Sequence, residues 1–424
     1  MTTDEKTSFL KAQWKFIIFS MIAYSFFYLT RKNLSMATPF LTDPETGLVS
    51  KETLGIFISV HGVLYGLSRF VNGFWADRLN GRIFMTVGLA LSAAMNFAFG
   101  CSSWAIFFGI FWIANGWVQG MGFPPCAKML THWIHPKELS TKMSLWNTSH
   151  SFGSVMALGL CTCLFFFGFG WRWCFWIPAV LTLLAAVFCY FFVCESPTEA
   201  GVPELQLDDV AANKPASTVT TADRRRLVFG NRVIWMIAFA NFFVYIIRFG
   251  FLDWGPTFLK EFKGISVEKG GLMTIAFELA AVVGTIFAGW ATDRFFKGRG
   301  VRMSVICMFF AALFAFGFWY LPKGAPIWGA TLLLMGAGFC IYGPQALVGI
   351  VAANQATKEA AAMANGFVGV MGYLSTTVSG YGIAKVAHSF GWGPALCAIA
   401  GSALVGMLLF LMAWNAQATG YKKQ

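Results

Sequence analysis

Long apolar stretches recur along the whole chain, and short polar segments separate them. Each stretch can cross a bilayer as a helix, because an apolar core about 30 Å thick takes about 20 residues. A backbone inside lipid must satisfy its own hydrogen bonds, which favours helices. We therefore predict an all-α membrane protein with twelve transmembrane helices, at 14–40, 52–76, 83–103, 105–130, 140–167, 173–194, 232–259, 268–292, 303–321, 327–353, 360–387 and 393–414.

One polar gap, at 195–229, is much longer than the others. It contains three prolines, several acidic residues and the run Arg224-Arg225-Arg226. Proline and charge together are typical of a connecting segment that no lipid covers. The gap predicts a cytoplasmic linker between an N-terminal six-helix bundle, residues 1–194, and a C-terminal six-helix bundle, residues 230–424.

The two predicted bundles share short motifs. Gly73-Phe-Trp-Ala-Asp77-Arg78 recurs as Gly289-Trp-Ala-Thr-Asp293-Arg294 at an offset of 216 residues, and Tyr28-Leu-Thr-Arg31 recurs as Tyr245-Ile-Ile-Arg248 at an offset of 217. Two matches at nearly one offset indicate a duplicated unit in parallel orientation. We therefore expect pseudo-symmetric halves with a binding site near the membrane midplane between them.

The repeated Gly-x-x-x-Asp-Arg motif lies where an apolar stretch ends and a basic loop begins. We expect its glycine, Gly73 or Gly289, to permit close helix approach, while the carboxylate and guanidinium pair or cap helix ends. Topogenic charge alone is the alternative explanation. Because the motif recurs in both halves, we favour a gating latch, made by Asp77 with Arg78 and by Asp293 with Arg294.

Composition and charge agree with a lipid environment. Of 424 residues, 57% are apolar and 12% are charged, against roughly 45–50% and 25% in soluble domains. In the loops and near the ends of the predicted spans, twenty Lys and Arg residues lie on the side of the N-terminus and seven on the other side. The positive-inside rule then places both termini in the cytoplasm. Topology explains the net charge of +12 without nucleic acid.

The ten cysteines and the N-terminal segment limit compartment and chemistry. Most cysteines lie inside predicted spans, where cysteine acts as a small apolar packing residue, so we expect no disulfide framework, no metal and no cofactor. The first apolar stretch is too long for the core of a cleavable signal peptide. We expect a multi-pass plasma-membrane protein, most simply of a bacterial inner membrane.

Six charges lie far from any predicted loop: Arg31, Lys32, Arg69, Arg248, Asp253 and Glu278. A charge at mid-bilayer costs at least a few kcal/mol, so these residues are candidates for function. Each cation could also snorkel to the interface or belong to a structural ion pair. If the two carboxylates pair with Lys32 and Arg69, the guanidiniums of Arg31 and Arg248 remain, at equivalent positions of the repeat.

Two remaining guanidiniums suit a dianion. A phosphate monoester near neutral pH carries about −1.5 to −2 charges. Arginine fits such a ligand because its planar fork donates two parallel hydrogen bonds and stays protonated. Polar and aromatic side chains in neighbouring spans are candidates for contacting the organic part of the ligand: Tyr24, Tyr28, Asn147, His150, Tyr245, Tyr342 and Tyr373.

Some of these positions have simpler interpretations. His150 titrates near physiological pH and can donate to phosphate, but hydrogen-bonded packing explains it equally well. We expect the Gly and Pro residues of Gln119-Gly-Met-Gly-Phe-Pro-Pro and of Tyr342-Gly-Pro-Gln345 to bend their helices rather than to bind a ligand.

These motifs resemble, over nearly the whole chain, the organophosphate:phosphate antiporters of the major facilitator superfamily. The marks are Tyr28-Leu-Thr-Arg31-Lys32-Asn33, Gln119-Gly-Met-Gly-Phe-Pro-Pro-Cys126, Trp146-Asn147-Thr148-Ser149-His150, Tyr245-Ile-Ile-Arg248 with Asp253-Trp254, and Tyr342-Gly-Pro-Gln345. The resemblance implies the major facilitator fold and phosphate binding by Arg31 and Arg248, assisted by His150. It also implies interdomain salt bridges among Lys32, Asp253, Arg69 and Glu278.

The resemblance further implies a secondary transporter, not an enzyme, that exchanges a phosphate ester for inorganic phosphate by alternating access. We expect it to act as a monomer. Ala364-Asn365-Gly366-Phe367-Val368-Gly369 is most similar to the hexose-phosphate branch, so hexose 6-phosphate, and glucose 6-phosphate in particular, is the expected ester. The eleventh span lacks the intramembrane acid and base that some hexose-phosphate carriers have there.

Three alternatives remain open. The chain could exchange glycerol 3-phosphate for phosphate, or it could be a membrane receptor that senses hexose phosphate without much transport. A proton-coupled drug or sugar carrier is the third alternative. It would need a lone protonatable carboxylate facing the cavity, and none remains if Asp253 and Glu278 are both paired.

Overall fold

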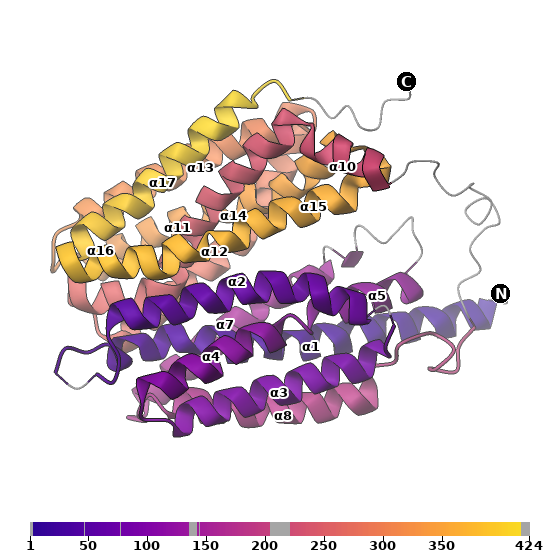
Figure 1. Ribbon diagram of the computed structural model, residues 1–424, viewed down its shortest axis with the longest axis horizontal. Coiled ribbons are helices and arrows are strands. Elements are labelled where there is room, and N and C mark those ends of the chain that lie inside the picture. Colours follow the sequence, from indigo (N-terminus) through magenta and orange to yellow (C-terminus); the bar gives the residue numbers. More distant parts are fainter. Residues whose placement is uncertain are drawn as a thin grey trace. The chain divides into compact units, whose positions relative to one another are not determined.

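The computed structural model describes residues 3–45, 47–76, 78–134, 142–143, 145–203 and 221–416, and every regular element in these ranges is helical. Figure 1 shows the arrangement of the helices. From the first half of the chain come α1 (Thr3–Leu41), α2 (Lys51–Ala76), α3 (Gly81–Cys101), α4 (Ala105–Gln119), α5 (Phe123–Trp133), α7 (Ser149–Phe166) and α8 (Trp173–Phe192). From the second half come α10 (Thr221–Phe229), α11 (Arg232–Lys263), α12 (Val267–Phe296), α13 (Gly300–Tyr320), α14 (Ile327–Gln355), α15 (Thr357–Leu374), the π-helix η1 (Thr377–Gly382), α16 (Ile383–Phe390) and α17 (Trp392–Met412).

Ten segments of the described chain are long and apolar enough to cross a membrane, which confirms a multi-pass, all-helical membrane protein. They match ten of the twelve predicted spans. The first predicted span lies in α1, which carries Arg31 and Lys32, and the eleventh is divided among α15, η1 and α16. Neither is among the ten, so the total of twelve stays a prediction.

Packing divides the chain into two compact units. Unit 1 comprises Met1–Ala37 and Leu64–Pro215, and unit 2 comprises Thr38–Val63 and Ala216–Gln424. The segment Thr38–Val63, which contains the end of α1 and the first half of α2, therefore groups with the second half of the sequence. Much of the predicted linker, residues 204–220, lies outside the described residues, and the division into bundles 1–194 and 230–424 remains a proposal.

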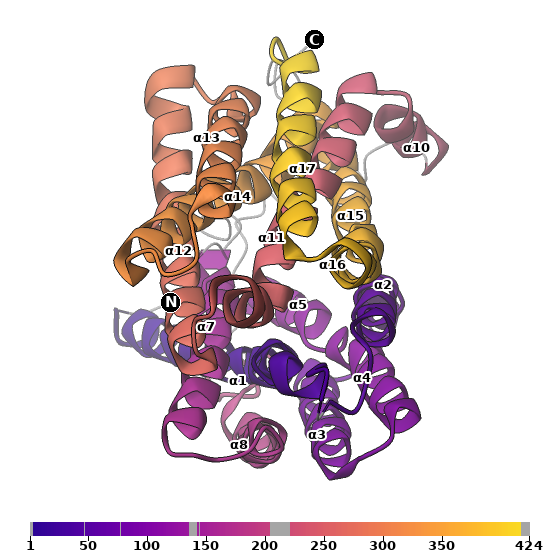
Figure 2. The same ribbon diagram turned by 90° about the vertical axis from the view of Figure 1, so that its left-hand side faces the viewer.

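In unit 1, α3 and α8 lie side by side, as both ribbon views show (Figures 1 and 2). Their contact is aromatic: the ring of Phe99 stacks on Phe175, with centroids 4.2 Å apart and planes 20° from parallel. Phe108 of α4 packs on the same Phe99 ring at 4.8 Å. These three rings are fully buried, so they hold α3, α4 and α8 in fixed register.

In unit 2, α12 and α14 cross closely because glycines face backbone on both sides. A Cβ at Gly284 would meet the carbonyl oxygen of Phe339 at 1.9 Å, and one at Gly338 would meet the carbonyl oxygen of Phe277 at 2.4 Å. Without side chains at these points, two membrane helices can pack backbone to backbone. The crossing fixes Glu278 of α12 opposite the middle of α14.

The π-helix η1 packs against α2 within unit 2. A π-turn leaves backbone groups without their usual helical partners. The Ser59 Oγ donates to the carbonyl oxygen of Thr376 at 2.8 Å and accepts from the backbone N–H of Tyr381 at 2.8 Å. A Cβ at Gly62 would lie 2.4 Å from the Thr376 side chain. Ser59 therefore supplies hydrogen-bond partners at this break in the helix, and Gly62 leaves room for Thr376.

The predicted close approach at the motif glycines stays a prediction, and within the described structure neither glycine lies in a tight helix contact. Among the described residues, a Cβ at Gly73 or at Gly289 would meet nothing within 4 Å, because both glycines point into open space near the end of their helix. Close approach on α12 is made by Gly284 instead. Arg78, Asp293 and Arg294 are exposed, and Asp77 lies outside the described residues.

Two glycines of α12 test this assignment. We expect Gly284→Ala to lower the melting temperature of the detergent-solubilised protein, because overpacking a close contact costs about 1–3 kcal/mol. Gly289→Ala is the matched control: the space around Gly289 is open, and alanine favours helix over glycine, so its melting temperature should equal or exceed that of the wild type. Equal melting temperatures for the two variants would contradict the assignment.

Candidate functional site

Arg31 lies in unit 1 on α1, with its guanidinium against two aromatic rings. The guanidinium carbon is 3.8 Å from the ring centroid of Tyr65 on α2 and 4.8 Å from that of Tyr28, one turn earlier on α1. Its Nε donates to Oε1 of Gln119 at 3.2 Å. Rings stabilise a cation through their negative faces, so the contacts compensate for part of the lost hydration of Arg31.

Gln119 is a site residue that the sequence interpretation missed. Its motif does interrupt the helix, as predicted, because α4 ends at Gln119 and α5 begins at Phe123. The Gln119 side chain, however, is buried and contacts Arg31 as well as hydroxyl groups of α1 and α3. Its position 88 residues from Arg31 offers no local signal. The one signal that could have indicated it is an amide among apolar residues in the middle of the fourth predicted span, 105–130.

Aromatic residues of α1 and α7 continue the site in unit 1. The ring of Tyr28 lies 5.8 Å from that of Tyr24 and 5.8 Å from the His150 imidazole, between centroids. The Nδ1 of His150 is 2.8 Å from the hydroxyl oxygen of Ser151. Tyr24, Tyr28 and His150 are thus brought together with Arg31, whereas Asn147 is exposed one position after the buried Trp146.

Arg248 lies in unit 2 on α11 and is also surrounded by rings. Its guanidinium carbon is 4.6 Å from the ring centroid of Tyr342 on α14, and 5.7 Å and 5.6 Å from those of Tyr245 and Phe249. The ring of Tyr373 packs on Tyr245 with centroids 5.7 Å apart. The three predicted tyrosines therefore lie with Arg248 in one cluster.

A carboxylate completes the cluster in unit 2. The hydroxyl of Tyr342 donates to Oε1 of Glu278 at 2.7 Å, and Glu278 is fully buried. Tyr342, predicted as a ligand contact, thus has a structural partner in its own unit. α14 runs through Tyr342 and Pro344 as one continuous helix.

The other predicted charges are divided between the units. In unit 1, Lys32 is buried, and Arg69 lies over the ring of Phe123 at 4.3 Å. Asp253, in unit 2, is half-buried on α11. The predicted ion pairs join residues of different units and stay proposals.

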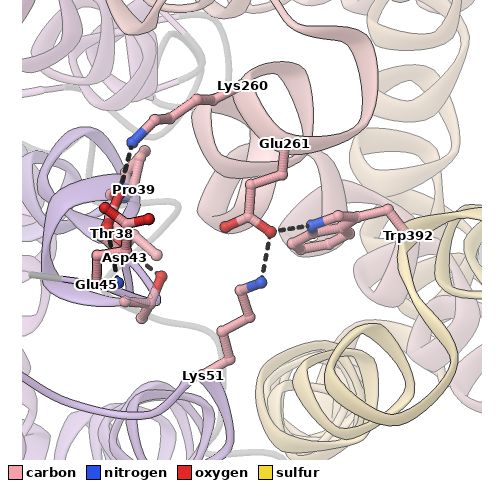
Figure 3. Close-up of polar contacts among 9 residues, drawn as sticks. Thr38, Pro39, Asp43, Glu45, Lys51, Lys260, Glu261 and Trp392 are labelled. Atoms are coloured by element: carbon pink, nitrogen blue, oxygen red, sulfur yellow. Dashed lines mark hydrogen bonds and ion pairs between the residues drawn. The ribbon is translucent and has the colours of Figure 1, made fainter. Parts of the chain in front are cut away.

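A second polar cluster in unit 2 was not predicted. Glu261 of α11 accepts hydrogen bonds from Lys51 at the start of α2 and, at 2.8 Å, from the indole N–H of Trp392 at the start of α17 (Figure 3). Next to it, Lys260 donates to Asp43 at 3.2 Å and to the carbonyl oxygen of Pro39 at 3.3 Å. We call Asp43, Lys51, Lys260, Glu261 and Trp392 the α11-end cluster.

The sequence carries a signal for this cluster. Lys51 and Lys260 are among the seven basic residues on the side opposite the N-terminus. Opposite charges near the ends of the first, second and seventh predicted spans fall on the same side of the membrane, so they could have been matched in pairs. The cluster ties Thr38–Val63 to α11 and α17 within unit 2.

Comparisons with known proteins agree with the fold. A model of the Major Facilitator Superfamily matches residues 20–380. A solved structure of a bacterial homologue of the human lysosomal transporter Spinster superposes with a TM-score of 0.71 at 16% identity, covering 96% of each chain.

Relatives with higher identity cover almost the whole chain. It is 33% identical to a probable hexose phosphate transport protein of Chlamydia trachomatis, over 98% of this chain and 94% of that protein. It is 34% identical to the glycerol-3-phosphate transporter of Bacillus subtilis, over 93% and 90%, and 31% identical to the membrane sensor protein UhpC of Escherichia coli, over 93% and 91%. The chain therefore belongs to the Major Facilitator Superfamily, a family of transporters rather than enzymes, and within it to the group that contains these organophosphate transporters and the sensor.

Proposed function

We propose that this protein is a secondary transporter that exchanges a sugar phosphate for inorganic phosphate. The observation that carries the proposal is the matched pair Arg31 and Arg248. They occupy equivalent positions of the internal repeat, and each lies against tyrosine rings in its own unit. We call each arginine with its tyrosine rings a half-site. Two such half-sites suit a ligand with two negative charges and several equivalent oxygens.

In this proposal the phosphate group bridges the two arginines, and the organic part contacts the tyrosines. His150 assists from α7, and Lys32, Asp253, Arg69 and Glu278 form pairs between the bundles. Without a ligand the two guanidiniums repel each other, so the empty carrier reorients slowly. Loading nearly neutralises the site, and exchange is therefore faster than net transport.

Alternating access requires contacts that form in one state and break in another. The α11-end cluster supports this requirement, because it connects Thr38–Val63 to helices of the second half through half-buried ion pairs. Such pairs contribute about 0–1 kcal/mol each, so they are readily reversible. We propose that both termini are cytoplasmic, in a bacterial inner membrane, and that the transporter acts as a monomer.

The expected ester is a hexose 6-phosphate, glucose 6-phosphate first. The similarity to a probable hexose phosphate transport protein supports it, and the similarity to a glycerol-3-phosphate transporter supports the alternative ester. Competition decides between them: glucose 6-phosphate should inhibit phosphate exchange at a lower concentration than glycerol 3-phosphate. The reverse order would assign the chain to glycerol 3-phosphate.

A sensor is the second candidate, favoured by the similarity to a membrane sensor protein. A sensor would bind the ester but exchange little phosphate. Reconstitution of the purified protein into proteoliposomes loaded with phosphate separates the two functions. Tight binding of glucose 6-phosphate without counterflow of labelled phosphate would show that the protein is a sensor and not a transporter.

Bidentate recognition of phosphate can be tested by lysine substitution. We expect Arg31→Lys and Arg248→Lys each to raise the KM for inorganic phosphate at least about tenfold, because lysine keeps the charge but loses the planar fork. Exchange of labelled phosphate in proteoliposomes measures this change.

Arg172→Lys is the matched control. Arg172 also lies in unit 1, where it donates to the backbone carbonyl oxygens of Gly100 and Ser102, so its replacement should leave the KM within about twofold. If Arg31→Lys and Arg248→Lys behave like this control, the two arginines do not grip phosphate.

Charge reversal tests the α11-end cluster. Lys51→Glu or Glu261→Lys places like charges together. This should lower the maximal exchange rate about threefold or more, since the state in which the α11-end cluster forms becomes less favourable. The double variant with both charges swapped should recover more than half of the wild-type rate.

Lys323→Glu serves as the control, because Lys323 is an exposed loop residue of the same unit. It changes the net charge by the same amount as Lys51→Glu and should leave exchange unaltered. A swapped double variant no better than either single variant would remove this cluster from the transport cycle.

A further inference from the structure

A network of buried polar side chains lies beside Arg31 in unit 1. Its members come from α1, α3 and α4 and are at most 1% exposed: Thr30, Ser92, Asn96, Asn115 and Gln119. Buried amides and hydroxyls cost about 1–3 kcal/mol each when they lack partners. Their shared burial next to a candidate ligand-binding arginine therefore calls for a functional account as well as a structural one.

The polarity of the network can be read from its fixed end. The Nδ2 of Asn115 donates to the backbone carbonyl oxygen of Thr30 at 2.9 Å, and a carbonyl can only accept. The Oδ1 of Asn115 must then face a donor, which is the Ser92 hydroxyl at 2.7 Å. Having donated its single proton to Asn115, Ser92 can only accept from its other neighbours.

This polarity determines the orientation of Gln119. Its Nε2 lies 2.9 Å from the Ser92 Oγ and 3.1 Å from the Thr30 Oγ1, and it donates to both. The amide carbonyl, Oε1, is therefore turned away from these hydroxyls and toward Arg31. The amide oxygen fixed in this way can only accept, and it accepts the hydrogen bond from the Arg31 Nε–H.

Two constraints then orient the guanidinium of Arg31. The Tyr65 ring, 3.8 Å away, restricts its plane, and the bond from Nε to Gln119 restricts its rotation within that plane. When one edge of a guanidinium is held at Nε, its two terminal nitrogens form the fork that matches two oxygens of a phosphate. Recognition by such a fork depends on orientation to within about 10–20°.

We propose that Gln119 is a positioning residue for phosphate binding by Arg31, and that Ser92 and Asn115 fix the direction of its amide. The proposal rests on the proposed function, in which Arg31 binds the phosphate group. Gln119 does not itself contact the ligand. It acts by orienting the arginine, at the junction where α4 ends.

Replacing Gln119 tests the proposal. Gln119→Leu keeps the volume and removes the acceptor, so the KM for inorganic phosphate should rise about tenfold while kcat stays within about threefold. Gln119→Glu places a carboxylate against Arg31 and should raise the KM further, since it neutralises the cation. Exchange of labelled phosphate in proteoliposomes gives both constants.

The Arg31→Lys background distinguishes a positioning role of Gln119 from a purely structural one. In Arg31→Lys the fork is absent, so adding Gln119→Leu should change the KM less than about twofold. Ser304→Ala is the control for loss of a buried hydroxyl, because Ser304 bonds only within its own helix α13 in the described structure, to Gly300 at 3.0 Å. Ser92→Ala should raise the KM by a smaller factor than Gln119→Leu, and Ser304→Ala should leave it unchanged.

Each outcome bears on one claim. If Gln119→Leu lowers kcat at unchanged KM, or shifts the KM equally with and without Arg31→Lys, the positioning role is overturned. If Gln119→Leu does not fold, the isosteric Gln119→Glu carries the test. If the wild type exchanges no phosphate, the proposed transport fails, and calorimetric titration of inorganic phosphate into the wild type and Gln119→Leu still tests the positioning of Arg31.

Discussion

Removing a guanidinium from water costs several kcal/mol unless rings and acceptors replace its hydration. The surroundings of Arg31 and Arg248 are organised by this cost. Tyrosine rings cover both arginines at distances of 3.8–4.8 Å, and the aromatic residues around them come from several helices. The same packing that compensates for the burial also holds the cations in a fixed direction, so stabilisation of the fold and preparation of a binding group have one cause.

The two half-sites compensate for the burial of their arginines in different ways, although the repeat places these arginines at equivalent positions. Arg31 has a neutral amide at its Nε, and that amide is held by hydroxyls. Arg248 has a phenol over its plane, and that phenol donates to a buried carboxylate. A carboxylate lowers the local positive potential, whereas an amide does not. An asymmetric ligand such as a phosphate ester would therefore meet two unequal arginines.

Much of the fold could be predicted from apolar stretches, because lipid imposes length and helicity on every crossing. The repeat likewise pointed to Arg31 and Arg248 as candidate site residues from sequence alone. Gln119 could not be identified as their neighbour, because the direction of its amide depends on Ser92 and Asn115 in other helices. The roles of Gly73 and Gly284 depend on which face of a helix packs against another backbone. The sequence does not reveal that face, because the residues are apolar all around these helices.

The polar character of α1 has a consequence for how the chain enters the membrane. Besides carbonyl oxygens of α1 itself, Thr30 and Asn33 have partners in α3, α4 and α8, between 62 and 141 residues later in the chain. During synthesis these helices do not yet exist, and polar groups in lipid without partners are unfavourable. A newly made α1 is therefore held poorly by lipid alone. We expect its stable insertion to wait until the later helices emerge and supply the missing acceptors and donors.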